Sequence, residues 1–308
     1  MRINDIINEA ISLTKYTPAA INAVKSGIIE VIENFDKILF SKDEKEEIAL
    51  GTLKPINAKV IKHLANLDYA VSANLEAVGK EMGIPITVEF VEMDSKGEAS
   101  GLTVYLNKRY LAGIKKLVVE AVDQFTLDNA YAEDELLQAF KLVPKELPKQ
   151  LFKQQSDFDT RIKSLVSTFI HESVHAQQHK AQHDVGRFDT EYRSYLAPKS
   201  KFNDTMLGKD FAGTDKEYKI YRASPQEMAA FAHEDALKFI EAVGMDDANY
   251  DFSPANVKEA MQELQSYVAD YFKDKENPKE YRLFKRYSRL VYQEVQRYIE
   301  NILKKNNQ

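Results

Sequence analysis

Apolar residues recur every three or four positions along most of this 308-residue chain, a spacing typical of amphipathic α-helices. One such run begins at Thr17-Pro18 and continues to about Phe40, and a second begins at Pro55 and stops near Gly83. The first 83 residues are therefore predicted to be helical, and nothing in this region suggests catalytic chemistry.

The period changes to two in the next part of the chain, where apolar and polar residues alternate over 86–92 and again over 102–107. Residues 94–98 between them carry turn-forming side chains, so the two segments are predicted to be the strands of a hairpin. Residues 117–125 fit either a third strand or a helix, and residues 133–156 fit short helices.

Helical spacing returns in the second half of the chain. One helix is expected to begin near residues 156–159, where serine and aspartate side chains can cap it. Residues 184–216 are irregular, and a serine followed by a proline then marks the start of another helix. The later helices are expected at about 224–244, 253–272 and 278–305. These patterns together predict an α+β protein that is mostly helical.

Residues 171–175 read His-Glu-Ser-Val-His inside the helix expected from about residue 156. His171 and His175 lie on one helix face with Cβ atoms about 5–6 Å apart, so both imidazoles can bind one metal ion. Glu172 then projects beside that ion, where a metal-activated water needs a general base. The motif predicts a catalytic metal site.

Two further histidines, His179 and His183, continue the same stripe and are interpreted as its solvated extension. His179 lies about 12 Å from His171 along the helix axis, too far to share one ion. The metzincin pattern would place a glycine and a histidine where the chain has Gln178 and Ala181. That class of metalloprotease is therefore excluded.

A catalytic zinc site needs a third protein ligand and an open position for water. Glu227 is the favoured candidate, because it lies in the first turn of a helix whose small residues Ala229 and Ala230 let a neighbouring helix pack closely. Asp215 and Glu234 are the alternatives. Asp215 lies in a segment that resembles the aspartate-bearing segment of aspzincins, one residue short in spacing, and Glu234 lies two turns after Glu227.

The H-E-x-x-H motif followed by Glu-x-x-x-Phe-Ala at residues 227–232 resembles the gluzincin metallopeptidases. The segment from Tyr221 to Ala230 is similar to the Tyr…Pro-x-Glu-x-x-Ala segment of metallopeptidases from phages and bacteria. The resemblance covers roughly residues 85–240. It implies a zincin-like core and one zinc ion per chain, with His171, His175 and Glu227 as ligands and Glu172 as the general base.

The same resemblance implies a zinc metalloendopeptidase that acts on a peptide or protein substrate. Tyr221 is the candidate donor to the oxyanion, with Tyr218 behind it. In zincins the strand nearest the motif helix pairs with the extended substrate, and residues 101–107 are expected to be that edge strand. The alternative function is a catalytically silent, zincin-fold structural protein, for example one associated with a virion.

Three regions are expected along the chain. Residues 1–83 form an N-terminal helical region, residues 84–244 form the metallopeptidase core, and residues 245–308 form C-terminal helices that pack on it. In the core, a small antiparallel sheet is expected to pack on the motif helix.

Composition limits the binding partners, the ligand chemistry and the compartment that we expect for this chain. The net charge of −6 gives no reason to expect nucleic-acid binding, and the absence of cysteine rules out thiolate ligands and disulfides. The sequence shows no signal-peptide pattern and no membrane-length apolar run, which favours a cytoplasmic protein. Basic and aromatic residues alternate in the last helix, but its glutamates and apolar positions favour a packed amphipathic helix over a nucleic-acid surface.

Overall fold

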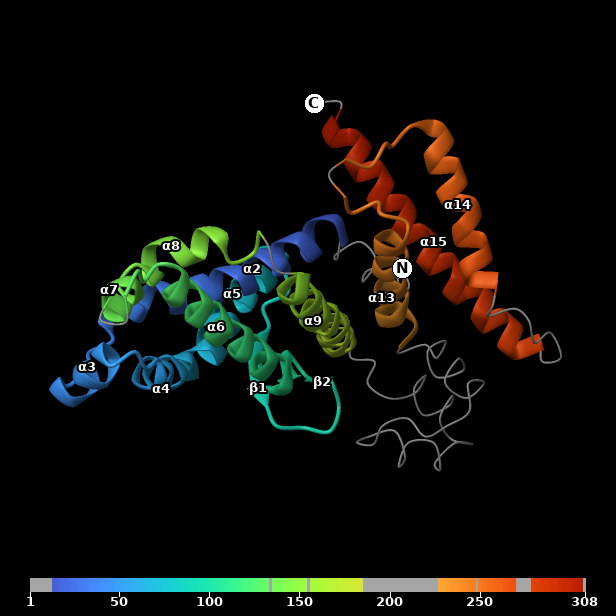
Figure 1. Ribbon diagram of the computed structural model, residues 1–308. Coiled ribbons are helices and arrows are strands. Elements are labelled where there is room, and N and C mark those ends of the chain that lie inside the picture. The colour runs from blue at the N-terminus through green and yellow to red at the C-terminus, as the bar shows by residue number, and fades with distance from the viewer. Residues whose placement is uncertain are drawn as a thin grey trace.

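The computed structural model is an elongated α+β protein in which helices predominate. A helical lobe lies at one end, the long helix α9 lies in the middle beside a small sheet, and helices α13 to α15 lie at the other end (Figure 1). The structure describes residues 13–132, 135–153, 156–184, 227–247, 249–269 and 278–306.

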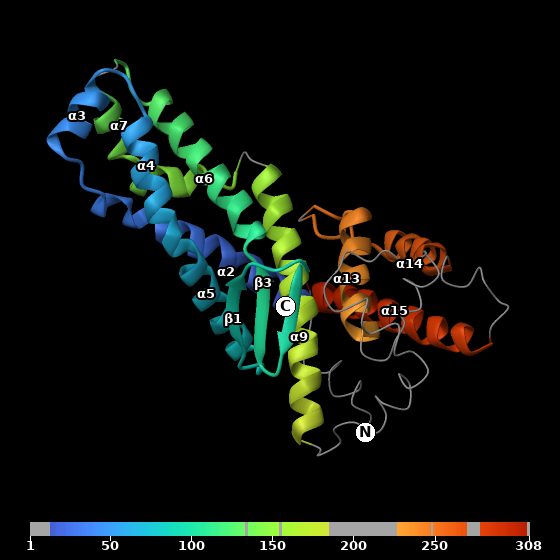
Figure 2. The ribbon, with the colours of Figure 1, turned by 90° about the horizontal axis from the view of Figure 1, so that it is seen from below.

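Helices α2 (Leu13–Glu33) and α5 (Leu67–Glu81) lie side by side and form the spine of the helical lobe (Figure 2). Gly27 permits this close approach, because a Cβ there would lie 3.0 Å from the Cα of Val71 on α5. The predicted second helix is divided in two by a 3₁₀ turn. The intervening elements are a 3₁₀ turn at Asn34–Lys37, α3 at Lys42–Ala49, α4 at Lys54–His63 and a 3₁₀ turn at Leu64–Asn66.

The segment that fitted either a strand or a helix forms part of α6 (Arg109–Asp128). Its buried apolar residues recur every three or four positions, so a helix buries them on one face and a strand would not. The short helices expected around residues 133–156 are confirmed as α7 (Leu136–Phe140) and α8 (Val143–Gln150).

The sheet has three strands, β1 (Thr87–Val91), β2 (Gly97–Ser100) and β3 (Thr103–Asn107), in the order β1-β3-β2. β3 is central, pairs parallel with β1 and pairs antiparallel with β2. On the β1 side the backbone N–H of Val88 donates to Glu76 of α5, which covers that edge. β2 therefore forms the edge that lies beside α9 (Figure 2).

Three expectations about this sheet were wrong. The segments at 86–92 and 102–107 are parallel neighbours and not a hairpin, so the sheet is mixed and not antiparallel. Residues 101–107 contribute the central strand and not the edge strand. The hairpin turn lies at Gly101, whose φ of +59° suits glycine, while the turn-like residues near Gly97 begin the edge strand.

Helix α9 (Ser156–Asp184) begins where the serine and aspartate residues predicted it and carries the His-Glu-Ser-Val-His motif. It packs against α2, α6, α13 and both β2 and β3. The buried hydroxyl of Tyr16 donates to Ser173 Oγ at 3.0 Å, and Ser173 Oγ in turn donates to the carbonyl of Phe169. The N-terminal helix is thus fixed directly to the motif.

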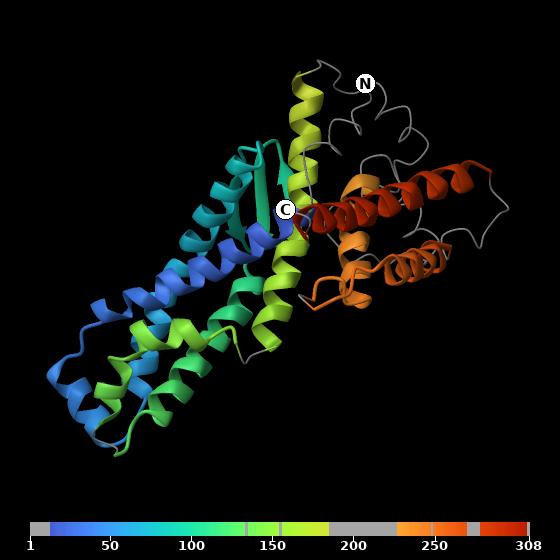
Figure 3. The ribbon, with the colours of Figure 1, turned by 90° about the horizontal axis from the view of Figure 1, so that it is seen from above.

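The C-terminal part consists of α13 (Glu227–Ala242), α14 (Pro254–Ala269) and α15 (Pro278–Asn306), close to the expected bounds. α15 packs along α13 and also contacts α2, as Figure 3 shows from above. The hydroxyl of Tyr287 of α15 donates to the buried carboxylate of Asp235 and lies 3.2 Å from the carbonyl oxygen of Phe231. These bonds join α15 to α13.

Buried apolar side chains form two clusters. The first core extends from Tyr16 to Ala230 and is continuous across the helical lobe, the sheet and α9. The second core extends from Met228 to Ile299 and joins α13, α14 and α15. α13 contributes to both. None of the described helices is long and apolar enough to span a membrane.

Candidate metal centre

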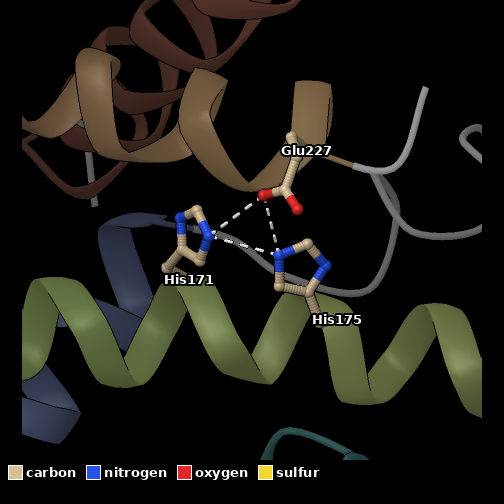
Figure 4. A group of neighbouring side chains, drawn as sticks. All are labelled: His171, His175 and Glu227. Atoms are coloured by element: carbon tan, nitrogen blue, oxygen red, sulfur yellow. Dashed lines mark hydrogen bonds and ion pairs between the residues drawn. The ribbon is translucent and has the colours of Figure 1, made fainter. Parts of the chain in front are cut away.

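The candidate site lies between α9 and the first turn of α13, two helices that are neighbours in space although about forty residues separate them in sequence. Ala229 and Ala230 are almost fully buried at this contact. Their small side chains let the helices approach closely, which places the preceding Glu227 over the imidazoles of α9 (Figure 4).

Three ligand-type atoms converge there. Glu227 Oε2 lies 3.4 Å from His171 Nε2 and 3.2 Å from His175 Nε2, and the two imidazole nitrogens lie 3.2 Å apart (Figure 4). Within the described residues, these three side chains form a group that could hold a metal ion. The candidate ligands predicted from sequence are therefore brought together in the fold.

The surroundings favour the ionised form of Glu227. Burial alone would raise the pKa of this carboxyl, but hydrogen bonds and charge from His171 and His175 outweigh it and hold the pKa well below its usual range. A carboxylate that remains ionised while largely enclosed is suited to binding a cation.

Glu172 lies beside this group and is 8% exposed. Burial raises the pKa of its carboxyl, while the charges of His171 and His175 oppose that shift. Gly97 of β2 lies directly against it, because a Cβ at that glycine would come within 2.9 Å of Glu172 Cγ and 2.7 Å of Thr168 Cγ2. The edge strand and α9 thus confine the side chain of the candidate base.

The second nitrogen of His171 points away from the ligand group. Within the described residues His171 Nδ1 is buried without a hydrogen-bond partner, and Glu234 Oε2 approaches it at 3.7 Å. Lys238 forms an ion pair with Glu234 at 2.6 Å. The ring of Phe231 packs edge-on against His171 with 4.6 Å between centroids. One helix, α13, therefore contacts both sides of this imidazole.

This geometry separates the alternatives for the third ligand. Glu234 lies on the Nδ1 side of His171, opposite the Nε2 atom that faces Glu227. Asp215, Tyr218 and Tyr221 lie outside the described residues, so their roles stay predictions. The side chains of His179 and His183 also lie outside the described part of the molecule.

Sequence reasoning did not find two residues of this site. The residues around Gly97 predict a turn, and the contact of Gly97 with Glu172 depends on the pairing of β2 with β3. Phe231 appeared as part of a motif, but its packing on His171 depends on how α13 docks. Its spacing of four residues from Glu227 was the available signal, since it places both side chains on the same helix face.

Comparison with known proteins adds no family assignment, because no protein-family model, no curated protein and no solved structure matches this chain. Its chemistry must therefore be argued from its own residues.

Proposed function

We propose that this protein is a zinc-dependent metalloendopeptidase with a zincin-like core. The observation that carries the proposal is the convergence of His171 Nε2, His175 Nε2 and Glu227 Oε2 beside a buried Glu172. Two imidazoles and one carboxylate, with a further carboxylate next to them, are the side chains that metal-assisted hydrolysis requires.

The spacing of the three atoms fits a tetrahedral ion. Ligand atoms about 2.0–2.1 Å from a tetrahedral centre are about 3.3 Å from one another. The three observed separations are 3.2, 3.2 and 3.4 Å. An ion capping this triangle would satisfy all three atoms and leave a fourth position open. The nitrogen and oxygen donors suit zinc, which is bound by this combination in catalytic sites.

Zinc in this position would supply a Lewis acid that polarises a peptide carbonyl and makes water more acidic. Glu172 would accept a proton from the attacking water as the new carbon–oxygen bond forms. The same carboxyl would then donate that proton to the peptide nitrogen as the carbon–nitrogen bond breaks.

The substrate is proposed to be an extended peptide that aligns along β2. The strand that pairs with the substrate was expected at residues 101–107, but these contribute the central strand. The edge strand beside α9 is β2, and we assign the pairing role to it. Extended peptides bind such edges through backbone hydrogen bonds, a mode called β-strand addition. Gly97 brings the edge close to Glu172, so a bound peptide would run past the candidate base.

Metal content tests the proposal. Protein purified without added metal would be analysed by mass spectrometry, as wild type and as Glu227→Ala. Near-stoichiometric zinc in the wild type and little in the variant is the expected result. Zinc retained by the variant would move the third ligand to another residue. No zinc in the wild type, even after zinc is offered, would overturn the proposal.

Hydrolysis separates an enzyme from a silent, metal-binding structural protein. Unfolded casein would be incubated with zinc-loaded wild type and with Glu172→Gln, and the products mapped by mass spectrometry. Cleavage by the wild type and none by the variant, with equal zinc in both, supports the enzyme. Equal zinc without cleavage by either protein would favour the silent alternative.

A further inference from the structure

A cavity of about 830 Å³ opens beside His171 and Glu172. It follows α9 away from the motif, toward the N-terminal end of that helix, and the α9 residues that line it extend back to Asp159. α2 forms one wall and α13 forms the other. The cavity is therefore an elongated cleft whose one end is the candidate metal centre.

The length of the cleft can be expressed in substrate residues. His171 and Asp159 are twelve residues apart on α9, which corresponds to about 18 Å at a rise of about 1.5 Å per residue. An extended peptide advances about 3.3 Å per residue. The cleft beyond the metal centre therefore matches about five consecutive residues on one side of the scissile bond.

The walls of the cleft carry partly exposed apolar side chains. Ile21 and the exposed Pro18 line it from α2, and Phe231 and Leu237 line it from α13. Asn22 adds an exposed amide on the α2 side. These groups favour uncharged substrate side chains, because each apolar side chain that leaves water here gains hydrophobic stabilisation.

Several charged side chains that line the cleft are paired with one another. Lys25 of α2 contacts Asp159 of α9 at 2.9 Å. Lys163 of α9 lies 2.8 Å from Glu241 and 3.2 Å from Asp246. These pairs bridge the elements that form the cleft and neutralise part of the charge on its walls, which favours uncharged substrate side chains there.

We propose that this cleft binds about five residues of an extended polypeptide on one side of the scissile bond and prefers uncharged, largely apolar side chains. The inference rests on the proposed peptidase function and specifies its substrate class. It also assigns a binding role to α2, a helix of the N-terminal region. The protein would then act on unfolded or extended polypeptide and cleave short peptides poorly.

The test uses peptides built around a cleavage site mapped in casein and lengthened one residue at a time on each side. For the wild type, kcat/KM should rise through about five residues on one side and then level off. Asn22→Trp introduces a bulky side chain on the cleft wall. It should lower kcat/KM about tenfold for long peptides and leave kcat/KM for short peptides unchanged. Ser26→Trp, one turn further along α2 and outside the cleft lining, is the matched control.

Binding gives a second readout that does not depend on turnover. Fluorescence anisotropy of labelled peptides with Glu172→Gln should show tighter binding as the peptide lengthens, and the added Asn22→Trp change should abolish that trend. Length-dependent binding without cleavage would support the cleft while rejecting the peptidase. Cleavage or binding that does not change beyond two residues on either side would overturn the cleft and leave the peptidase proposal intact.

Discussion

His171 is the residue whose environment most constrains the candidate centre. Its Nε2 faces Glu227, its Nδ1 faces Glu234, and its ring packs on Phe231. A histidine that binds a metal ordinarily donates its other N–H to a carboxylate or carbonyl, which fixes its tautomer and orientation. Glu234 is placed to accept that proton once the imidazole shifts slightly toward it.

We therefore expect Glu234→Gln to weaken zinc affinity about 10- to 100-fold, since loss of such a partner removes the constraint on the ligand. Competition with a chromogenic chelator would measure the affinity. Glu241→Gln is the matched control, because Glu241 lies on the same helix but pairs with Lys163. Equal affinities for both variants and the wild type would show that Glu234 does not orient His171.

The buried side chains of His233 and Glu294 lie 3.4 Å apart between α13 and α15. Burial raises the pKa of Glu294 from 4.5 to about 7, with Arg297 opposing the shift. Burial lowers the pKa of His233 from 6.5 to about 4. The native state therefore favours the uncharged form of both groups.

The two groups have opposite effects on stability as pH changes. The contribution of Glu294 is present below pH 4.5 and is lost as pH rises to about 7. The contribution of His233 is present above pH 6.5 and is lost as pH falls toward about 4. In the wild type these trends oppose each other over the range that they share.

Each single substitution leaves only the pH trend of the other group, so the difference from the wild type reports the contribution of the group that was removed. Relative to the wild type, Glu294→Gln should lose stability on acidification from pH 7 to 4.5, and His233→Gln should gain stability on acidification from pH 6.5 to 4. Urea unfolding at a series of pH values would measure the free energy of unfolding. Differences from the wild type that stay constant with pH in both variants would contradict the assignment.

At the scale of elements, β2 is positioned by its contact with α9. Gly97→Ala would place a Cβ within 2.9 Å of Glu172 Cγ and 3.2 Å of the Tyr105 carbonyl, so the strand or the glutamate must move. We expect a large loss of kcat with zinc content unchanged, because Glu172 is not a proposed ligand. Gly27→Ala on α2 is the control, because its Cβ would crowd Val71 of α5 at 3.0 Å in a part of the molecule remote from the site. This variant should lower stability without a selective loss of kcat. A normal kcat in Gly97→Ala would show that β2 does not position Glu172.

The elements also show what the sequence could predict. The helices followed from local spacing of apolar residues, and the contact of Glu227 with His171 and His175 followed from chemistry, because a metal site needs a third ligand. The sheet order did not follow. Turn-forming residues at both 94–98 and Gly101 allowed two pairings, and only long-range packing of β3 between β1 and β2 decides between them. The cleft was missed because α2 lies far from the motif in sequence.

At the scale of the whole molecule, the proposed ligands connect the two cores. His171 and His175 lie on α9, whose apolar residues belong to the first core. Glu227 begins α13, whose Met228, Ala232 and Phe239 belong to the second core. An ion bound by all three side chains would therefore join two units that each bury their own apolar surface, and binding would stabilise the native state by mass action.

We accordingly expect zinc to raise the melting temperature and to make unfolding more cooperative. At a free zinc concentration about 1,000 times the dissociation constant, the gain would be about 4 kcal/mol. Differential scanning calorimetry of zinc-loaded protein should give one transition. After chelation the second core should melt separately at lower temperature, because the contact between α9 and α13 would then lack the shared ion and rest on packing and the exposed Lys163–Glu241 ion pair. Glu227→Ala should behave like the chelated protein whether or not zinc is added. A single transition that neither chelation nor Glu227→Ala alters would mean that no metal couples the two cores.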